Sequence, residues 1–153
     1  MDSILDLTRE LCLLPTGVVH EGNIPFFERV NREIPICLHR VPSGQEYNGW
    51  VVPDLWKVEK ATIEHNGKVV HDGCAHPLGV ASYSRSFKGE ITLSELKRHL
   101  FGNPRLPDAM MWHCVWGYRP WEENWGFSMP MSQIENLEEG AYKIDLQTSF
   151  SPS

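Results

Sequence analysis

The amino-acid sequence lacks long hydrophobic runs, paired cysteines and a basic leader. No apolar stretch in its 153 residues approaches the ~20 residues that a helix needs to cross a bilayer. The acidic start has no basic segment and no small-residue cleavage site, so we expect a cytoplasmic protein and not a secreted one. The four cysteines are widely separated and form no C-x-x-C pair, which in the cytoplasm favours free thiols over disulfides.

The sequence also lacks a basic patch. Its formal net charge is −6, and the densest basic group is Lys97, Arg98 and His99. Proteins that bind nucleic acid neutralise phosphates with clustered basic residues, and anionic membrane surfaces attract clusters of Lys and Arg. We therefore expect neither nucleic acid nor a membrane as a partner.

Apolar periodicity predicts a helical start. Residues 3–14 carry one apolar stripe of helical spacing, and Ser3 can cap this helix by accepting a free backbone N–H group. A second helix is predicted for residues 24–34, with Asn23 as its cap. Pro35 ends this helix, and the pattern changes there from helical spacing to alternation.

Most of the remaining sequence alternates with period two, which is typical of half-buried strands. The dipeptide Asn66-Gly67 predicts a two-residue hairpin turn, and Thr92 with Glu95 forms a capping box before a predicted helix. Further strands are predicted at residues 36–41, 46–52, 79–87, 110–118 and 141–150, with helical segments at 92–101 and 132–137.

These elements predict an α+β fold. Two N-terminal helices precede a mostly antiparallel β-sheet or sandwich-like domain with one crossing helix. The change of pattern predicts a helical arm at residues 1–34 and a β-rich domain at residues 35–153, which together form one structural unit.

Six segments occur in an order that is typical of a known family. They are "HRVPSGQEYNGWVVPDLW", "HPLGVASYS", "LSELKRHLF", "LPDAMMW", "NWGFSMP" and "YKIDLQTSF". Together they resemble the N-terminal part of bacterial zinc-aminopeptidase-like proteins, which carry an inserted β-rich accessory domain of unknown function. Those proteins are often linked to surface-polysaccharide or natural-product gene sets. The resemblance covers roughly residues 5–150 and implies that residues 35–153 are the accessory-type domain.

The resemblance also implies what the chain does not contain. The zinc ligands of the family lie downstream of the segment that matches "YKIDLQTSF", so no metal ligand and no cofactor is expected here. Ser128 stands where the family usually has a cysteine. We expect a stand-alone descendant that kept the accessory region and lost the peptidase, with a fragment of a longer protein as the alternative.

One stretch, "VVHDGCAHPLG", is rich in metal-binding side chains. His71, Cys74 and His76 with Asp72 could assemble a zinc site from imidazoles, a thiolate and a carboxylate. The alternative is that Asp72-Gly73 forms a turn after the hairpin and that His76 precedes the next strand. Because the spacing matches no standard zinc pattern, we favour the turn.

Tryptophans are concentrated in "WHCVWGYRPWEENW". Aromatic side chains of this kind form either a core wall or a binding wall, where a ligand stacks on the rings. Packing is the commoner use of large aromatics. The candidate ligand-binding residues are Trp112, Trp116, Tyr118, Trp121 and Trp125, together with Trp50 earlier in the chain.

Two histidines are candidates for acid–base chemistry, because imidazole moves protons near neutral pH. We predict His113 and His76 as catalytic residues, helped by the carboxylate of Glu123. The protein would bind a small, partly apolar or amino-acyl biosynthetic intermediate. If it is an enzyme, it would be a metal-independent lyase, isomerase, cyclase or hydrolase and not a zinc peptidase. The alternative is a non-catalytic module that pairs with itself, as a homodimer, or with a peptidase paralogue.

Overall fold

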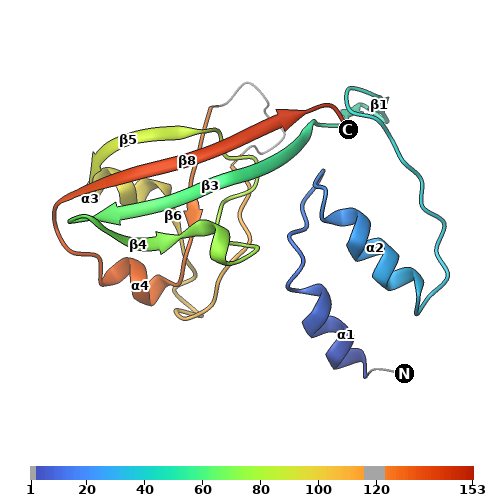
Figure 1. Ribbon diagram of the computed structural model, residues 1–153, viewed down its shortest axis with the longest axis horizontal. Helices are drawn as coiled ribbons and strands as arrows, with labels where there is room; N and C mark the ends of the chain where they lie inside the picture. The colour runs from blue at the N-terminus through green and yellow to red at the C-terminus, as the bar shows by residue number, and fades with distance from the viewer. Residues whose placement is uncertain (1–2, 116–122) are drawn as a thin grey trace. The chain divides into compact units, whose positions relative to one another are not determined.

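The computed structural model describes residues 3–115 and 123–153 (Figure 1). Packing divides the chain into two compact units. The first comprises Met1–Lys57 with Phe150–Ser153, and the second comprises Val58–Ser149. The predicted boundary between residues 34 and 35 marks a change of secondary structure and stays a prediction.

The first helix, α1 (Ile4–Leu11), confirms the helical start. It begins at Ser3, whose hydroxyl accepts a hydrogen bond from the Asp6 backbone N–H at 3.2 Å. The hydroxyl satisfies one of the N–H groups that have no partner inside the helix. The predicted N-cap is therefore confirmed, although the helix ends three residues earlier than the stripe suggested.

The second helix, α2 (Asn23–Asn31), starts differently from the prediction. Asn23 does not cap it, because this residue already lies inside the helix and Gly22 occupies the cap position. The side-chain amide of Asn23 instead binds the backbone of Gly17, accepting from its N–H at 3.1 Å and donating to its carbonyl at 2.8 Å. It fixes the loop that leads into the helix.

Two strand predictions in the first unit are wrong. Residues 36–41 form no strand: they lie between Pro35 and Pro42, and most of them are exposed. The segment predicted as one strand at residues 46–52 is a hairpin, in which β1 (Glu46–Tyr47) pairs antiparallel with β2 (Trp50–Val51). Asn48-Gly49 forms the turn, with both residues at positive φ, as a tight hairpin requires.

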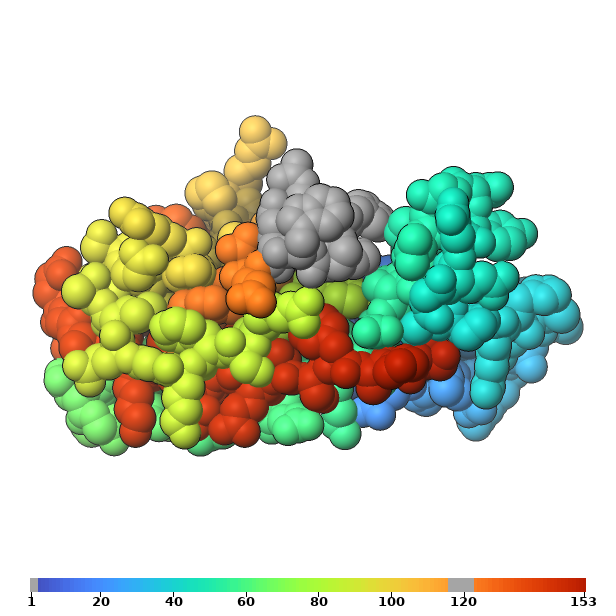
Figure 2. Space-filling view, turned by 90° about the horizontal axis from the view of Figure 1, so that it is seen from above, coloured from blue at the N-terminus to red at the C-terminus, as the bar shows by residue number. Residues whose placement is uncertain are grey.

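A four-stranded sheet is the largest element of the fold. Its order is β4-β3-β8-β5, and β3 and β8 lie side by side at its centre (Figure 1). In Figure 2 the red atoms of β8 form a band between the yellow-green atoms of β5 and the green atoms of β3. The strands are β3 (Leu55–His65), β4 (Lys68–Asp72), β5 (Phe87–Thr92) and β8 (Ala141–Ser151). The pairs β3–β4 and β5–β8 are antiparallel, and Asn66-Gly67 turns the chain between β3 and β4 as predicted.

The two faces of this sheet differ in polarity. Buried Ile63, Ile144 and Leu146 point to the core, because alternate residues of a strand face the same side. On the other face Lys60 donates to Asp145 at 2.6 Å. This hydrogen bond and the lysine charge lower the pKa of Asp145. The sheet therefore has one apolar and one charged face, as expected for an antiparallel sheet in an α+β protein.

The crossing helix is shorter than predicted. Helix α3 (Leu93–Leu96) begins at Thr92, whose hydroxyl accepts from the Glu95 N–H, and continues as a 3₁₀ turn over Lys97–His99. The chain then enters a short strand, β6 (Leu100–Phe101), which pairs parallel with β7 (Phe127–Ser128). Helix α4 (Met131–Glu135) follows where a helical segment was expected.

Residues 79–86 and 110–115 form no regular strand, contrary to the prediction, and Phe87 belongs to β5. Single bridges join Val80 to Phe127 and Ser82 to Cys114, and Tyr83, the residue after Ser82, has a φ of 64°. A residue at this φ cannot continue a ladder, which needs extended backbone. Residues 116–118 of the second predicted strand lie outside the described residues.

Ser128 holds the irregular segment at residues 110–115 in place of strand pairing. This serine is completely buried, and its hydroxyl both donates to the Met111 carbonyl and accepts from the Met111 N–H. The backbone N–H and carbonyl of Met111 thus both find their hydrogen-bond partner in one side chain. We conclude that Ser128 anchors this segment to β7.

We predict that Ser128→Ala destabilises the fold by about 1–3 kcal/mol, because it leaves two partly buried backbone groups of Met111 without their partner. Urea denaturation followed by tryptophan fluorescence measures this change. Ser149→Ala is the matched control, since Ser149 is exposed and makes only a 3.3 Å hydrogen bond to Glu59. Equal unfolding midpoints for the two variants would show that Ser128 is not an anchor.

Candidate functional site

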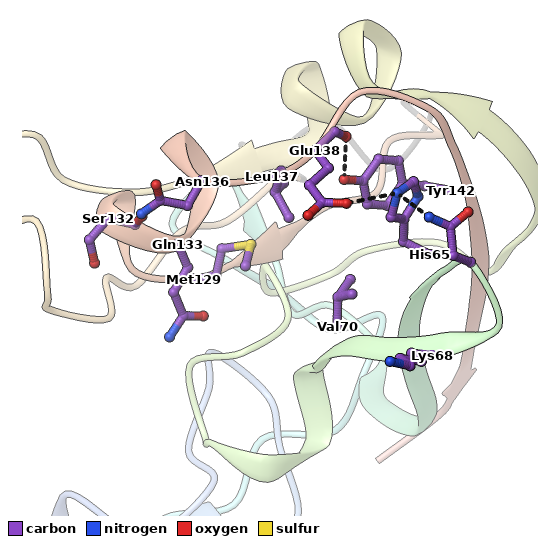
Figure 3. A pocket seen from close by; sticks show the side chains of 11 residues that line it. His65, Lys68, Val70, Met129, Ser132, Gln133, Asn136, Leu137, Glu138 and Tyr142 are labelled. Carbon is purple, nitrogen blue, oxygen red and sulfur yellow. Dashed lines mark hydrogen bonds and ion pairs between the residues drawn. The ribbon is translucent and has the colours of Figure 1, made fainter.

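A cavity of about 830 Å³ opens in the second unit (Figure 3). The β3–β4 hairpin, helix α4 and the start of β8 enclose it. Val70 and Met129 supply apolar surface. The polar lining residues are His65, Asn66, Lys68, Ser132, Gln133, Asn136, Glu138 and Tyr142. Its volume is in the range of small-molecule sites.

The hydrogen bonds of His65 define its tautomer. Its side chain is 9% exposed, and Nδ1 lies 2.9 Å from the Ala141 carbonyl oxygen. Because a carbonyl only accepts, Nδ1 must carry a proton. In the neutral ring Nε2 is then an acceptor, and it lies 3.1 Å from the Asn66 amide nitrogen. A carboxylate oxygen of Glu138 is 3.9 Å from the same Nε2.

The ring of Tyr142 supports the imidazole from one face. The two ring centroids are 4.4 Å apart, with an angle of 17° between the planes. The phenol donates to the Glu138 backbone carbonyl at 2.7 Å. Burial raises the pKa of Tyr142, and the carboxylates of Glu138 and Glu139 raise it further. Tyr142 is therefore a neutral phenol at physiological pH and serves to position its neighbours.

Gly140 lets the chain pass close to the imidazole. Its φ is +145°, which side chains rarely allow, and a Cβ on it would lie 2.7 Å from Cε1 of His65. The strand β8 therefore starts directly against the ring, and the Ala141 carbonyl comes within hydrogen-bond distance of Nδ1. Backbone and imidazole are thus fixed together.

Helix α4 presents amide and hydroxyl groups to the cavity. Ser132 donates to Asp108 at 2.8 Å, and the Asn136 amide donates to the Ser132 carbonyl at 2.7 Å. Within residues 3–115 and 123–153, the side chain of Gln133 has no hydrogen-bond partner. The cavity thus combines fixed polar groups with an amide that is free to bind a ligand.

The predicted catalytic residues lie elsewhere and do not line this cavity. The half-buried ring of His113 stacks on Phe101, with centroids 3.6 Å apart, and burial lowers the pKa of His113. His76 accepts a hydrogen bond from the Leu78 N–H at its Nδ1, 3.0 Å away. Glu123 is exposed. Their roles as acid, base and helper stay predictions.

The described part of the tryptophan cluster does not form a continuous wall. Trp125 is buried between His99 and Phe87, with centroid distances of 3.8 and 4.4 Å, so both of its faces are covered. Trp112 is 56% exposed, and Trp50 is also exposed. The other three candidates, Trp116, Tyr118 and Trp121, lie outside the described residues.

The stretch "VVHDGCAHPLG" is the end of β4 followed by a turn. Asp72 accepts from the Cys74 N–H at 2.9 Å and starts a 3₁₀ turn, as the turn interpretation predicted. His71 packs edge-on against Phe127, and burial lowers its pKa. Burial also raises the pKa of the Cys74 thiol, which disfavours a thiolate. In the described part of the chain, no three His, Cys, Asp or Glu residues are grouped to hold a metal ion.

Sequence reasoning missed His65, Glu138 and Tyr142. His65 continues the alternation of Ala61 and Ile63 on β3, so it falls on the apolar face. A histidine in that position needs hydrogen-bond partners, and this requirement was the available signal. No pattern shows that the partner would be a backbone carbonyl 76 residues away.

Comparison with known proteins places the chain in a family. Residues 55–149 match the family described as "Domain of unknown function (DUF2172)". Because this match covers more than half of the chain, the chain belongs to the DUF2172 family. The matched residues include most of the four-stranded sheet and the His65 cavity, so the site lies within the family's own domain.

Relatives from Clostridium acetobutylicum match nearly the whole chain. One, named "Putative polysaccharide biosynthesis protein with aminopeptidase-like domain", is 28% identical over 96% of this chain and 33% of its own length. The crystal structure of a "putative peptidase" from the same species has a TM-score of 0.80 and 27% identity, covering 96% of this chain and 34% of that one. The chain thus spans about a third of the length of these relatives, and it corresponds to an accessory region of peptidase-like proteins.

These findings support the resemblance to aminopeptidase-like proteins and the mixed α+β fold. In the described residues, no helix has the length and apolarity to cross a membrane.

We predict that Gly140→Ala lowers stability and displaces the His65 ring by more than the strain of an alanine at positive φ alone would do. Gly67→Ala is the matched control: Gly67 also has positive φ, but nothing lies within 4 Å of its would-be Cβ. Left-handed strain costs roughly 1–2 kcal/mol at either position, and Gly140→Ala adds the contact with His65. Urea denaturation gives the two stabilities, and the imidazole NMR signals report on His65. If both variants lose equal stability and keep the His65 signals, the close approach is not a constraint.

Proposed function

We propose that this region binds a polar small molecule, rich in hydroxyl or amide groups, in the His65 cavity. It does so as the accessory region of an aminopeptidase-like protein. The observation that carries the proposal is the lining, which combines amide, imidazole and hydroxyl groups with an apolar surface of similar extent. Such groups exchange hydrogen bonds with sugar hydroxyls and acyl amides.

The positions of the polar groups support binding. The His65 ring is held by the Ala141 carbonyl on one edge and by Tyr142 on one face, so it needs no reordering. A fixed polar group costs less side-chain entropy when a ligand arrives. The name of the Clostridium relative includes polysaccharide biosynthesis, which favours a carbohydrate building block as the ligand.

Catalysis by the predicted acid–base residues is a more specific proposal than ligand binding. His113, His76 and Glu123 could still act on a partly apolar or amino-acyl intermediate beside the tryptophans. The pKa of His113 is lowered by burial, so its ring is neutral and able to accept a proton. Because these three residues do not line the His65 cavity, we propose binding in that cavity first.

We predict that the protein binds monosaccharide phosphates with a measurable Kd and that Gln133→Ala weakens the binding about 5- to 10-fold, the loss of one hydrogen bond of about 1 kcal/mol. NMR titration measures both constants. Gln45→Ala is the matched control, because Gln45 is exposed in the other unit. A failure of sugars and sugar phosphates alike to shift the signals of the cavity residues would refute the proposed function.

Self-association is a second candidate function, favoured by one observation. Strand β4 is an edge of the four-stranded sheet in the described chain, and Val69 and Val70 on it are 56% and 40% exposed. An exposed apolar edge strand is a template for pairing with another chain. We propose that β4 can pair with the same strand of a second copy.

This pairing predicts a dimer at high protein concentration, which light scattering detects. Val69→Lys should give a monomer, because a charge at the edge opposes pairing. Leu106→Lys, a change at an exposed loop residue, should leave the dimer intact. A strict monomer for the unaltered protein at every concentration would exclude the pairing.

A further inference from the structure

Two opposite charges line the His65 cavity without neutralising one another. Glu138 and Lys68 both belong to the lining, and no ion pair joins them. In Figure 3, Glu138 lies above and Lys68 below, with Val70 between them in the view. In the described residues Lys68 makes no ion pair at all. The cavity therefore presents a cation and an anion at separate places.

The carboxylate of Glu138 is accessible to a ligand. One of its oxygens lies 3.9 Å from Nε2 of His65. In the tautomer fixed by the Ala141 carbonyl, neutral Nε2 has no proton to give and accepts from Asn66 instead. The carboxylate thus receives no hydrogen bond from the imidazole in this state. Its side chain is 80% exposed, so a ligand can reach it.

Lys68 complements this arrangement. It is the first residue of β4, directly after the hairpin turn, and its partner across the hairpin is His65. The ammonium therefore comes from the end of a short hairpin turn, and the carboxylate comes from the loop before β8.

From these charges we infer that the cavity takes a ligand with a primary ammonium group, which pairs with Glu138, and an anionic group, which pairs with Lys68. The inference rests on the proposed function, since it concerns the same cavity and names the class of its ligand. The hydroxyl and amide partners around the charges favour an amino sugar phosphate over an amino acid or peptide. Charge-assisted hydrogen bonds of this kind are stronger than neutral ones.

The test compares four sugars and one peptide by titration calorimetry or NMR. Glucosamine 6-phosphate carries both charges. Glucose 6-phosphate and N-acetylglucosamine 6-phosphate lack the ammonium, and glucosamine lacks the anion. We expect glucosamine 6-phosphate to bind about 2- to 5-fold more tightly than each of the others, as exposed ion pairs allow. Dialanine has both charges but no sugar ring, and we expect it to bind more weakly.

Two variants assign the charges to residues. Glu138→Gln should remove the preference for glucosamine 6-phosphate over glucose 6-phosphate, and Lys68→Gln should remove its preference over glucosamine. The controls are Glu139→Gln and Lys97→Gln, because both residues are exposed and neither lines the cavity. They should keep both preferences.

The outcomes separate this inference from the proposed function. Equal binding of the four sugars, or preferences that survive in both cavity variants, would overturn the inference and leave the binding function standing. Binding of dialanine more tightly than any sugar, lost in both variants, would keep the charge assignment and replace the carbohydrate by a peptide. Absence of binding by all five compounds would overturn both proposals.

Discussion

The central position of β8 is the constraint on which the second unit depends. Among the described strands, β8 pairs with β5 on one side and with β3 on the other, so the sheet forms only when strands far apart in sequence come together. Its buried residues Tyr142, Ile144 and Leu146 cover the core along the strand. Burying side chains of this size stabilises a fold by roughly 1.5–3 kcal/mol each. A long-range pairing of this kind also carries the entropy of closing a long loop.

The same strand builds the candidate site. Gly140 and Ala141 bring its backbone against His65, and the Ala141 carbonyl fixes the imidazole proton on Nδ1. Tyr142, one residue later, covers the ring face. The acceptor on Nε2 is thus a consequence of where the sheet places β8. The site and the core thus share the strand β8, and a change that shifts this strand would alter both.

Local signals predicted much of the fold. Ser3 and Thr92 cap helices because a hydroxyl can satisfy free N–H groups next to it, and Asn66-Gly67 turns because both residues tolerate positive φ. The long alternation of residues 141–150 predicted β8 correctly. Such features depend on a few neighbouring residues, which a single sequence displays.

Features that depend on distant residues were not predictable in the same way. Residues 79–87 alternate like a strand, yet the hydroxyl of Ser84 binds the backbone of Ala81 and Gly126, and Tyr83 turns the chain. Residue type alone also predicted the wrong site. The residues around Asp72 are of types that bind metals but form a turn, whereas His65 follows the ordinary alternation of strand β3. What distinguishes His65 is a partner that lies far away in sequence and close in space. The carbonyl that fixes this imidazole belongs to the start of β8, so no short segment of the sequence indicates the cavity.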